Sequence, residues 1–170
     1  MLKPAYGYKD RISSILQEIA FSEEVTYWNH ACYWSYETDL KNDSWRSLHF
    51  VSVDDQDNIL GLLFADICRP ENFVDAMAIL NLKEKGNFKF SRDLYQFLDD
   101  LFVKFNFFKM TFCVVSGNPV EKMYDRFVLK FGGRIIGVYK QQVMLQDGKL
   151  YDQKHYELFR EDYMERRRLK

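Results

Sequence analysis

The chain has 170 residues, of which 47% are hydrophobic and 17% aromatic, with 8 glycines and 3 prolines. This length suits one domain with one buried core, so we expect residues 1–170 to form a single domain. The composition excludes a disordered or fibrous protein, and the net charge of −1 gives no reason to expect a nucleic-acid partner.

The distribution of cysteines and apolar residues points to a cytoplasmic protein. Residues 1–4 lack the apolar core of a signal peptide, and no apolar stretch approaches the roughly 20 residues that cross a bilayer. Cys32, Cys68 and Cys113 form no CxxC pair, and the three histidines lie far apart. We therefore expect no membrane partner, no metal site, and reduced thiols.

Two helices are predicted at the N-terminal end. Residues 10–20 carry isoleucine and leucine at helical spacing. In residues 22–42, Ser22 suits an N-cap and two glutamates follow it in the first turn. This second helix would carry aromatic residues on both faces, more than a core needs, so we expect a groove or a protein-partner surface there. The aromatic residues are Tyr27, Trp28, Tyr33, Trp34 and Tyr36.

Strand patterns follow. Residues 48–53 and 59–65 are rich in β-branched and aromatic residues and flank the turn-forming segment 54–58, which indicates a hairpin. Residues 73–82 form a third apolar stretch. Its periodicity leaves helix and strand open.

The next segments predict a helix, a strand and a second helix. Leucine and phenylalanine recur at helical spacing over residues 91–107, and residues 109–115 are rich in β-formers. Asn118 suits an N-cap, with Pro119 at the first helical position and a capping-box glutamate behind it. Two glycines at 132–133 should end that helix.

The last part of the chain predicts a hairpin and a basic tail. Residues 134–145 and 150–159 flank an Asp-Gly turn, which is a strong hairpin signal. Residues 126–170 carry 11 Lys and Arg against 6 Asp and Glu, whereas residues 1–125 carry 13 against 19. We interpret residues 163–170 as a short, solvated basic tail, with a weak polyanion patch as the alternative.

The order of these elements, together with three motifs, resembles the GNAT (GCN5-related N-acetyltransferase) superfamily. The motifs are SGNPVEKMY at 116–124, GGRIIG at 132–137, and DGKLYD at 147–152 with Tyr156 and Leu158 after it. They are nearest to the group that acetylates ribosomal-protein N-termini. The resemblance covers residues 48–162 and makes residues 73–82 a strand. It implies an α/β (α+β) fold whose mixed, mostly antiparallel sheet has six or seven strands and about four flanking helices.

The resemblance also implies that acetyl-CoA is the co-substrate. In the family, two splayed strands, here 73–82 and 109–115, hold pantetheine, and a loop that enters the following helix holds the pyrophosphate. The family loop reads Arg/Gln-x-x-Gly-x-Gly/Ala, whereas the corresponding segment 83–90 keeps one glycine and has Phe88 and Phe90 nearby, so it is degenerate. The implied cofactor-binding residues are Ala78, Ile79, Leu80, Lys85, Gly86, Asn87, Lys89, Arg92 and Asn118, with Lys83 as a further phosphate contact. The alternative for the lysines is a solvated basic loop.

Two residues are implied as catalytic. Tyr124 corresponds to the tyrosine that protonates the departing thiolate, although it stands one residue closer to Asn118 than in the family; packing in the core is its alternative. Asp75 is the first candidate for the general base and Asp66 the second, with a solvated carboxylate as the alternative for each. Cys113 has no histidine near it in the sequence, so we expect an inert thiol.

The resulting function prediction is transfer of acetyl from acetyl-CoA to a primary amine by direct attack. The alternative is a catalytically silent domain with the same fold that serves as a structural or protein-binding module, as in some phage proteins, and the degenerate loop supports it. A homodimer paired through the final hairpin is a further expectation.

Overall fold

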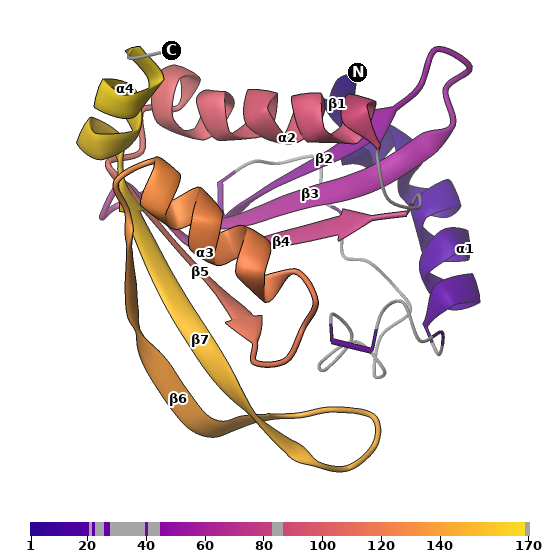
Figure 1. Ribbon diagram of the computed structural model, residues 1–170. Coiled ribbons are helices and arrows are strands. Elements are labelled where there is room, and N and C mark those ends of the chain that lie inside the picture. Colours follow the sequence, from indigo (N-terminus) through magenta and orange to yellow (C-terminus); the bar gives the residue numbers. More distant parts are fainter. Residues whose placement is uncertain (21, 23–25, 28–39, 41–44, 83–86, 169–170) are drawn as a thin grey trace.

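The computed structural model describes residues 1–20, 22, 26–27, 40, 45–82 and 87–168 (Figure 1). Within them, no helix is long and apolar enough to span a membrane. The strands are β1 (Leu2–Pro4), β2 (Ser47–Val53), β3 (Ile59–Cys68), β4 (Phe73–Asn81), β5 (Lys109–Val115), β6 (Arg134–Met144) and β7 (Leu150–Phe159). The helices are α1 (Lys9–Ile19), α2 (Phe88–Asp99), α3 (Glu121–Lys130) and α4 (Arg160–Arg168), with a 3-10 turn η1 (Ala5–Tyr8) and a π-helical turn η3 (Asp100–Lys104).

The seven strands form one sheet in the order β1-β2-β3-β4-β5-β7-β6. Every neighbouring pair is antiparallel except β4 and β5, which are parallel. The predicted mixed, mostly antiparallel sheet is confirmed, and the segment predicted as a strand over residues 73–82 forms β4. In Figure 1, β4 and β5 point in different directions, and the β6–β7 hairpin extends away from the rest of the sheet.

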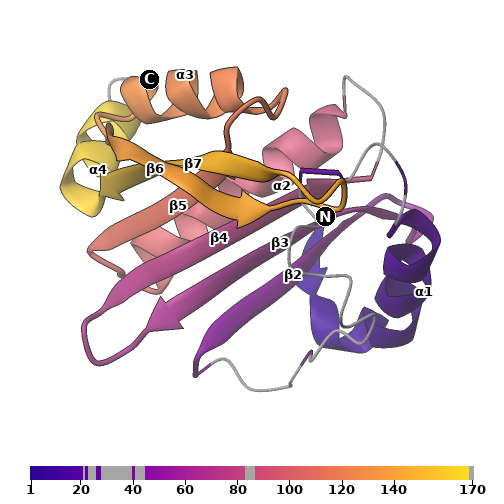
Figure 2. The same cartoon turned by 90° about the horizontal axis from the view of Figure 1, so that it is seen from below.

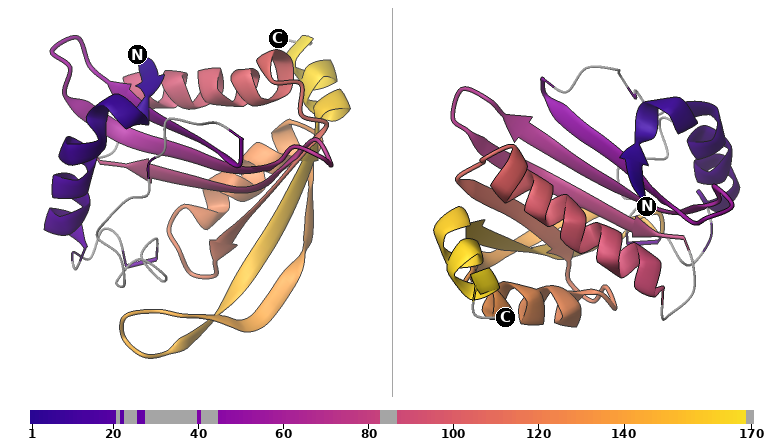
Figure 3. Two further views of the ribbon diagram at one scale, coloured as in Figure 1. Left: turned by 180° about the vertical axis from the view of Figure 1, so that it is seen from behind. Right: turned by 90° about the horizontal axis from the view of Figure 1, so that it is seen from above.

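Helices cover the two faces of the sheet unequally. On one face, α2 crosses β2 and β3 while α3 and α4 lie beside it, as the right panel of Figure 3 shows. On the other face, α1 packs on the outer strands (Figure 2). Its Ile12 is fully buried and packs in one cluster with Val51 and Leu62. Burial of apolar side chains on both faces is the main term that stabilises the fold. The larger core, under α2 and α3, is centred on Phe97, Phe102, Phe112, Phe131, Tyr156 and Leu158.

The C-terminal end is more ordered than the sequence pattern indicated. Residues that we interpreted as a solvated tail continue helix α4 to Arg168. Tyr163 is 2% exposed, and its ring lies 4.9 Å from those of Phe102 and Phe131. Its hydroxyl donates a 2.7 Å hydrogen bond to Asp99. One tyrosine in a charged segment gives no periodic signal, which is why this helix was missed.

Helix α3 starts later than the capping residues predicted. Asn118 is not the N-cap; its side chain accepts a 3.0 Å hydrogen bond from the Val120 amide in a turn before the helix. Glu121 reaches back to the amide of Gly117 at 3.0 Å. The end of the helix is as expected, because Gly132 adopts a φ of 79°. The helix predicted over residues 22–42 lies mostly outside the described residues.

Candidate active site

The centre of the sheet opens where β4 and β5 separate. Only two residue pairs join these strands, Phe73 with Lys109 and Val74 with Met110. Directly after them β4 has a bulge relative to β3, and the Thr111 hydroxyl donates a 2.6 Å hydrogen bond to the Asp75 carbonyl. The side-chain hydrogen bond of Thr111 thus replaces the next backbone hydrogen bond between β4 and β5. Beyond it, the β4 edge from Met77 onward has no strand partner on the β5 side in the described part of the chain.

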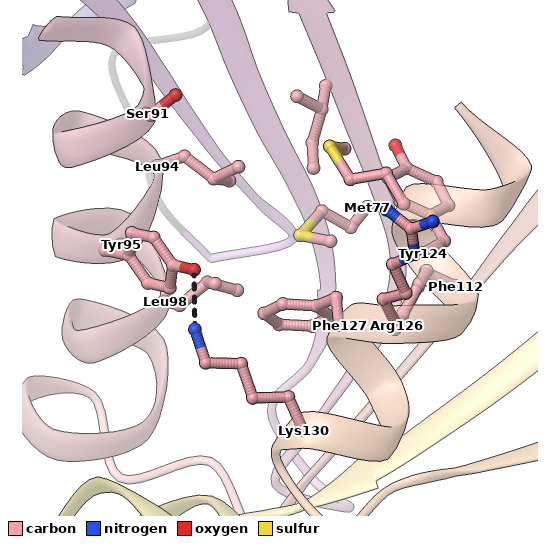
Figure 4. Close-up of a pocket in the computed structure, with 12 residues that line it drawn as sticks. Met77, Ser91, Leu94, Tyr95, Leu98, Phe112, Tyr124, Arg126, Phe127 and Lys130 are labelled. Atoms are coloured by element: carbon pink, nitrogen blue, oxygen red, sulfur yellow. Dashed lines mark hydrogen bonds between the residues drawn. The ribbon is translucent and has the colours of Figure 1, made fainter. Parts of the chain in front are cut away.

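A cavity of about 250 Å³ lies over this opening, between α2 and α3 (Figure 4). Its floor comes from the diverging strands and its walls from the two helices. The lining is mostly apolar, and its polar side chains come from both helices, Ser91 and Tyr95 from α2 and Tyr124, Arg126 and Lys130 from α3. Such a cavity suits a long, flexible ligand with an apolar body and a charged end. The lining residues are Met77, Ile79, Ser91, Leu94, Tyr95, Leu98, Phe112, Met123, Tyr124, Arg126, Phe127 and Lys130.

Tyr124 is the titratable group most perturbed by burial in this cavity. Its ring packs edge-on against Phe112 at 5.5 Å and Tyr156 at 6.2 Å. Burial, and to a smaller degree the side chain of Cys113, raises the pKa of its hydroxyl well above the usual value of 10. The hydroxyl therefore stays protonated at neutral pH and can act as a proton donor.

Two cationic side chains of α3 line the cavity. Lys130 of α3 contacts Tyr95 of α2, with 3.5 Å between its ammonium nitrogen and the hydroxyl oxygen (Figure 4). The same ammonium lies 5.6 Å from the ring centre of Tyr95. Arg126 lies one turn earlier on α3 and also lines the cavity. These two cations were missed in the sequence, although helical spacing of four residues puts them on one face.

The start of α2 holds several of the predicted phosphate contacts. Lys85 and Gly86 lie outside the described residues, as does Lys83. Asn87 is the N-cap of α2, and its side chain accepts a 3.1 Å hydrogen bond from the Phe90 amide. Lys89 forms a 2.6 Å ion pair with Asp55 of the β2–β3 turn, so its charge is already partnered.

The two phenylalanines near this segment lie in different surroundings. Phe88 is 86% exposed, whereas Phe90 is buried in the core. A β-carbon on Gly61 would stand 2.3 Å from the Phe90 ring, so that ring packs directly against β3. The Phe90 side chain therefore points into the protein and does not obstruct the entrance to α2.

The other predicted binding residues divide between the two faces of the sheet. Ile79 lines the cavity, whereas the alternation of a strand turns Ala78 and Leu80 to the opposite face, where Leu80 packs with the α1 core. Arg92 is mostly exposed and lies 3.5 Å from the buried carboxylate of Asp93. Asn118 is part of the turn before α3.

The candidate bases and Cys113 lie at or near the opening. Asp75 is the exposed bulge residue, and Asp66 is exposed on β3 opposite Ala76. Cys113 is half-buried on the open part of β5, and burial raises the pKa of its thiol, which agrees with an unreactive thiol. In the three-dimensional structure it does have a histidine neighbour, because His155 of β7 lies directly opposite. That neighbour follows from the pairing of β5 with β7, which no local motif encodes.

Comparison with known proteins locates this arrangement in a known fold. No protein-family model and no curated protein sequence matches the chain. Solved structures do match. The spermidine N-acetyltransferase of Vibrio cholerae in complex with CoA and spermine superimposes with a TM-score of 0.76 at 22% identity, covering 96% of this chain and 97% of that one. The spermidine/spermine N-acetyltransferase SpeG of the same organism in complex with manganese ions gives 0.72 at 20% identity, covering 98% and 95%.

The chain therefore has the GNAT fold. Its parallel pair β4–β5, open after two residue pairs, is the splayed pair expected from the sequence motifs. The likeness spans nearly the whole of both chains, so the N-terminal elements β1 and α1 belong to the shared fold as well. At 20–22% identity the likeness establishes the GNAT fold, and the roles of individual residues rest on the geometry described above.

Proposed function

We propose that this protein is an N-acetyltransferase that moves the acetyl group of acetyl-CoA to a primary amine by direct attack. The observation that carries the proposal is the cavity at the opening between β4 and β5, with the protonated Tyr124 hydroxyl in its wall. The structural likeness to an N-acetyltransferase in complex with CoA and spermine supports the same conclusion.

The cavity lining fits the two chemically different parts of acetyl-CoA. The apolar side chains of Ile79, Leu94 and Phe127 suit the pantetheine arm. In the described part of the chain, β4 has no β5 partner beyond Val74, so this edge is where the pantetheine amides would pair. Arg126 and Lys130 supply positive charge for the phosphates. This assignment compensates for the degenerate loop, because the phosphate charge is met by side chains of α3.

Tyr124 is proposed as the general acid. Acetyl-CoA supplies an acetyl group on a thiol leaving group, and the amine nitrogen bonds to the carbonyl carbon as the carbon–sulfur bond breaks. The thiolate then needs a proton. The Tyr124 hydroxyl carries a proton at neutral pH and belongs to a residue that lines the cavity, so it can deliver that proton.

The acceptor is a primary amine of one of two kinds. Two of the matching structures are spermidine N-acetyltransferases, which favours a polyamine. The sequence motifs favour a protein N-terminus, as in the ribosomal-protein group. Both approach the thioester as neutral amines, so the same chemistry serves either.

We retain three further predictions: a protein partner at residues 22–42, a homodimer and a cytoplasmic location.

Calorimetric titration and thermal-shift titration with acetyl-CoA test the proposal. At 100 times its dissociation constant, a ligand stabilises the folded protein by about 2.7 kcal/mol. Leu94→Trp fills the cavity and should abolish binding. Val103→Trp is the control, because Val103 is 45% exposed and lies outside the cavity. Absence of binding by the wild type at millimolar acetyl-CoA would refute the enzyme and favour a structural module.

A further inference from the structure

His155 lies on the face of the sheet opposite Tyr124. Its neighbours along β7, Lys154 and Tyr156, both reach Asp125 of α3, with 2.8 Å from the Tyr156 hydroxyl to that carboxylate. Successive side chains of a strand point to opposite faces, so His155 points away from α3. It lies directly across from Cys113, on the part of β5 that has already separated from β4.

The neighbours of His155 favour one tautomer. Its Nε2 lies 3.0 Å from Oε1 of Gln153, which is an acceptor, so Nε2 carries the hydrogen. Nδ1 then keeps a lone pair. The ring of Tyr139 on β6 lies over the imidazole with 4.2 Å between ring centres, which restricts its rotation. His155 is thus a neutral, oriented base that is still partly exposed to solvent.

The electrostatic surroundings of His155 keep it neutral. Burial lowers the pKa of its imidazole below the usual value of 6.5. The titratable groups that face it are Cys113 from β5 and Tyr139 from β6. Further along β7, the carboxylate of Glu157 forms an ion pair with Arg134. On the face of β7 that carries His155, the nearest charge along the strand is therefore compensated.

Tyr124 and His155 approach the same stretch of β5 from opposite faces. Tyr124 packs on Phe112 from the side of α3, and Cys113 is close enough to Tyr124 to act on its pKa. His155 faces Cys113 from the other side. A thioester held in the opening would have a proton donor on one face and a proton acceptor on the other, as direct amine transfer requires.

We propose that His155 is the general base of the reaction and that Gln153 orients it. This inference rests on the proposed acetyltransferase function. As the amine nitrogen bonds to the acetyl carbon and the carbon–sulfur bond breaks, Nδ1 of His155 takes the proton that the amine loses. The sulfur takes a proton from Tyr124. Afterwards the imidazolium releases its proton to solvent and the tyrosinate regains one, so no proton is gained or lost overall.

His155 suits this role better than Asp75 or Asp66. Both aspartates are exposed, and a solvated surface position is the common environment of a carboxylate without a catalytic role. The neutral imidazole of His155 keeps a lone pair on Nδ1 that can accept a proton. It also approaches the open part of β5, whereas Asp75 lies at the vertex of the opening.

The first experiment measures acetyl transfer from acetyl-CoA to two probes, spermidine and a tripeptide with a free N-terminus. His155→Gln should lower kcat about 100-fold or more and leave the acetyl-CoA dissociation constant within about twofold. His49→Gln is the matched control, because His49 packs on Phe64 far from β5 and should not affect kcat. If His155→Gln keeps the wild-type kcat, His155 is not the general base, although the protein is still an acetyltransferase. A wild type that transfers acetyl to neither probe would overturn both.

The second experiment does not depend on turnover. In protein labelled with nitrogen-15 at histidine, the imidazole shifts of His155 should show the Nε2–H tautomer at pH 7 and a pKa below 6.5. Gln153→Glu places a carboxylate beside the ring and should raise that pKa, and the acidic limb of kcat/KM should move to higher pH by the same amount. An Nδ1–H tautomer would contradict the role of His155. So would an acidic limb of kcat/KM that stays in place when the pKa of His155 changes.

Discussion

The Thr111 hydroxyl donates a 2.6 Å hydrogen bond to the Asp75 carbonyl, at the point where β4 and β5 stop pairing through their backbones. A second contact of 3.3 Å reaches the Val74 carbonyl. The Thr111 side chain thereby forms hydrogen bonds with two carbonyls of β4 that would otherwise be available to the next backbone amide of β5. The contact between Thr111 and Asp75 therefore marks the closed end of the opening that we assign to acetyl-CoA.

Replacing Thr111 by Val should weaken the vertex of the opening. The change keeps the shape of the side chain and removes the donor, so the free energy of unfolding should fall by about 1–2 kcal/mol. Thr111→Ser retains the hydroxyl and serves as the control. Urea denaturation of both variants measures the difference, and equal stability of Thr111→Val and wild type would show that water replaces the bond without loss.

Tyr124→Phe should separate binding from chemistry. Removing the hydroxyl leaves the ring contacts with Phe112 and Tyr156 in place, so the acetyl-CoA dissociation constant should change less than about twofold. Loss of a general acid should lower kcat by about 100-fold to 10,000-fold. Because burial raises the Tyr124 pKa, ionisation of this group should not lower the wild-type rate below pH 10. Unchanged turnover in the variant would return Tyr124 to a packing role.

Reversing the charge of Lys130 should weaken acetyl-CoA binding. Lys130→Glu puts a carboxylate at the rim where we place the phosphates, and loss of one charge-assisted contact should raise the dissociation constant about tenfold or more. Lys122→Glu is the matched control, because Lys122 is exposed on the same helix and does not line the cavity. If calorimetric titrations give the same acetyl-CoA dissociation constant for both variants, the change in net charge, and not a contact made by Lys130, explains the weaker binding.

The sequence predicted the elements with strong periodicity and the order in which they form the GNAT fold. Local patterns identified α1, the β2–β3 hairpin, β5 and the β6–β7 hairpin. They missed α4, whose single buried side chain, Tyr163, has no periodic partner. They also missed His155 as a neighbour of Cys113, because 42 residues separate the two in the chain and only the pairing of β5 with β7 joins them. Tertiary pairing is the information that a single sequence lacks.

Acid should destabilise the protein partly through Asp57. Hydrogen bonds from Lys3, Tyr8 and Arg11 lower the pKa of Asp57 to about 2, compared with about 3.9 in an unfolded chain. A lowered folded-state pKa stabilises the fold above pH 4, and this contribution is lost as the pH falls from about 4 to 2. Asp57→Asn keeps a residue that tolerates the positive φ of 65° and should remove this part of the pH dependence. Urea denaturation of both proteins at pH 2.5 and pH 6 measures the pH dependence of the free energy of unfolding. If that dependence is the same in Asp57→Asn and the wild type, groups other than Asp57 cause the acid sensitivity.

The contact between Gly61 and Phe90 couples β3 to the start of α2, and Gly61→Ala tests it. A β-carbon at this position would stand 2.3 Å from the Phe90 ring and 2.5 Å from the Leu80 carbonyl, so ring and backbone must both shift. Overpacking of this kind should lower the free energy of unfolding by about 1–3 kcal/mol.

The same shift should weaken acetyl-CoA binding, because Phe90 belongs to the first turn of the helix that forms one wall of the cavity. Gly7→Ala is the control, since nothing lies within 4 Å of its added carbon, and it should leave both stability and binding unchanged. If Gly61→Ala loses stability yet binds acetyl-CoA like the wild type, the position of α2 does not limit binding, and the phosphate contacts must come from α3 alone.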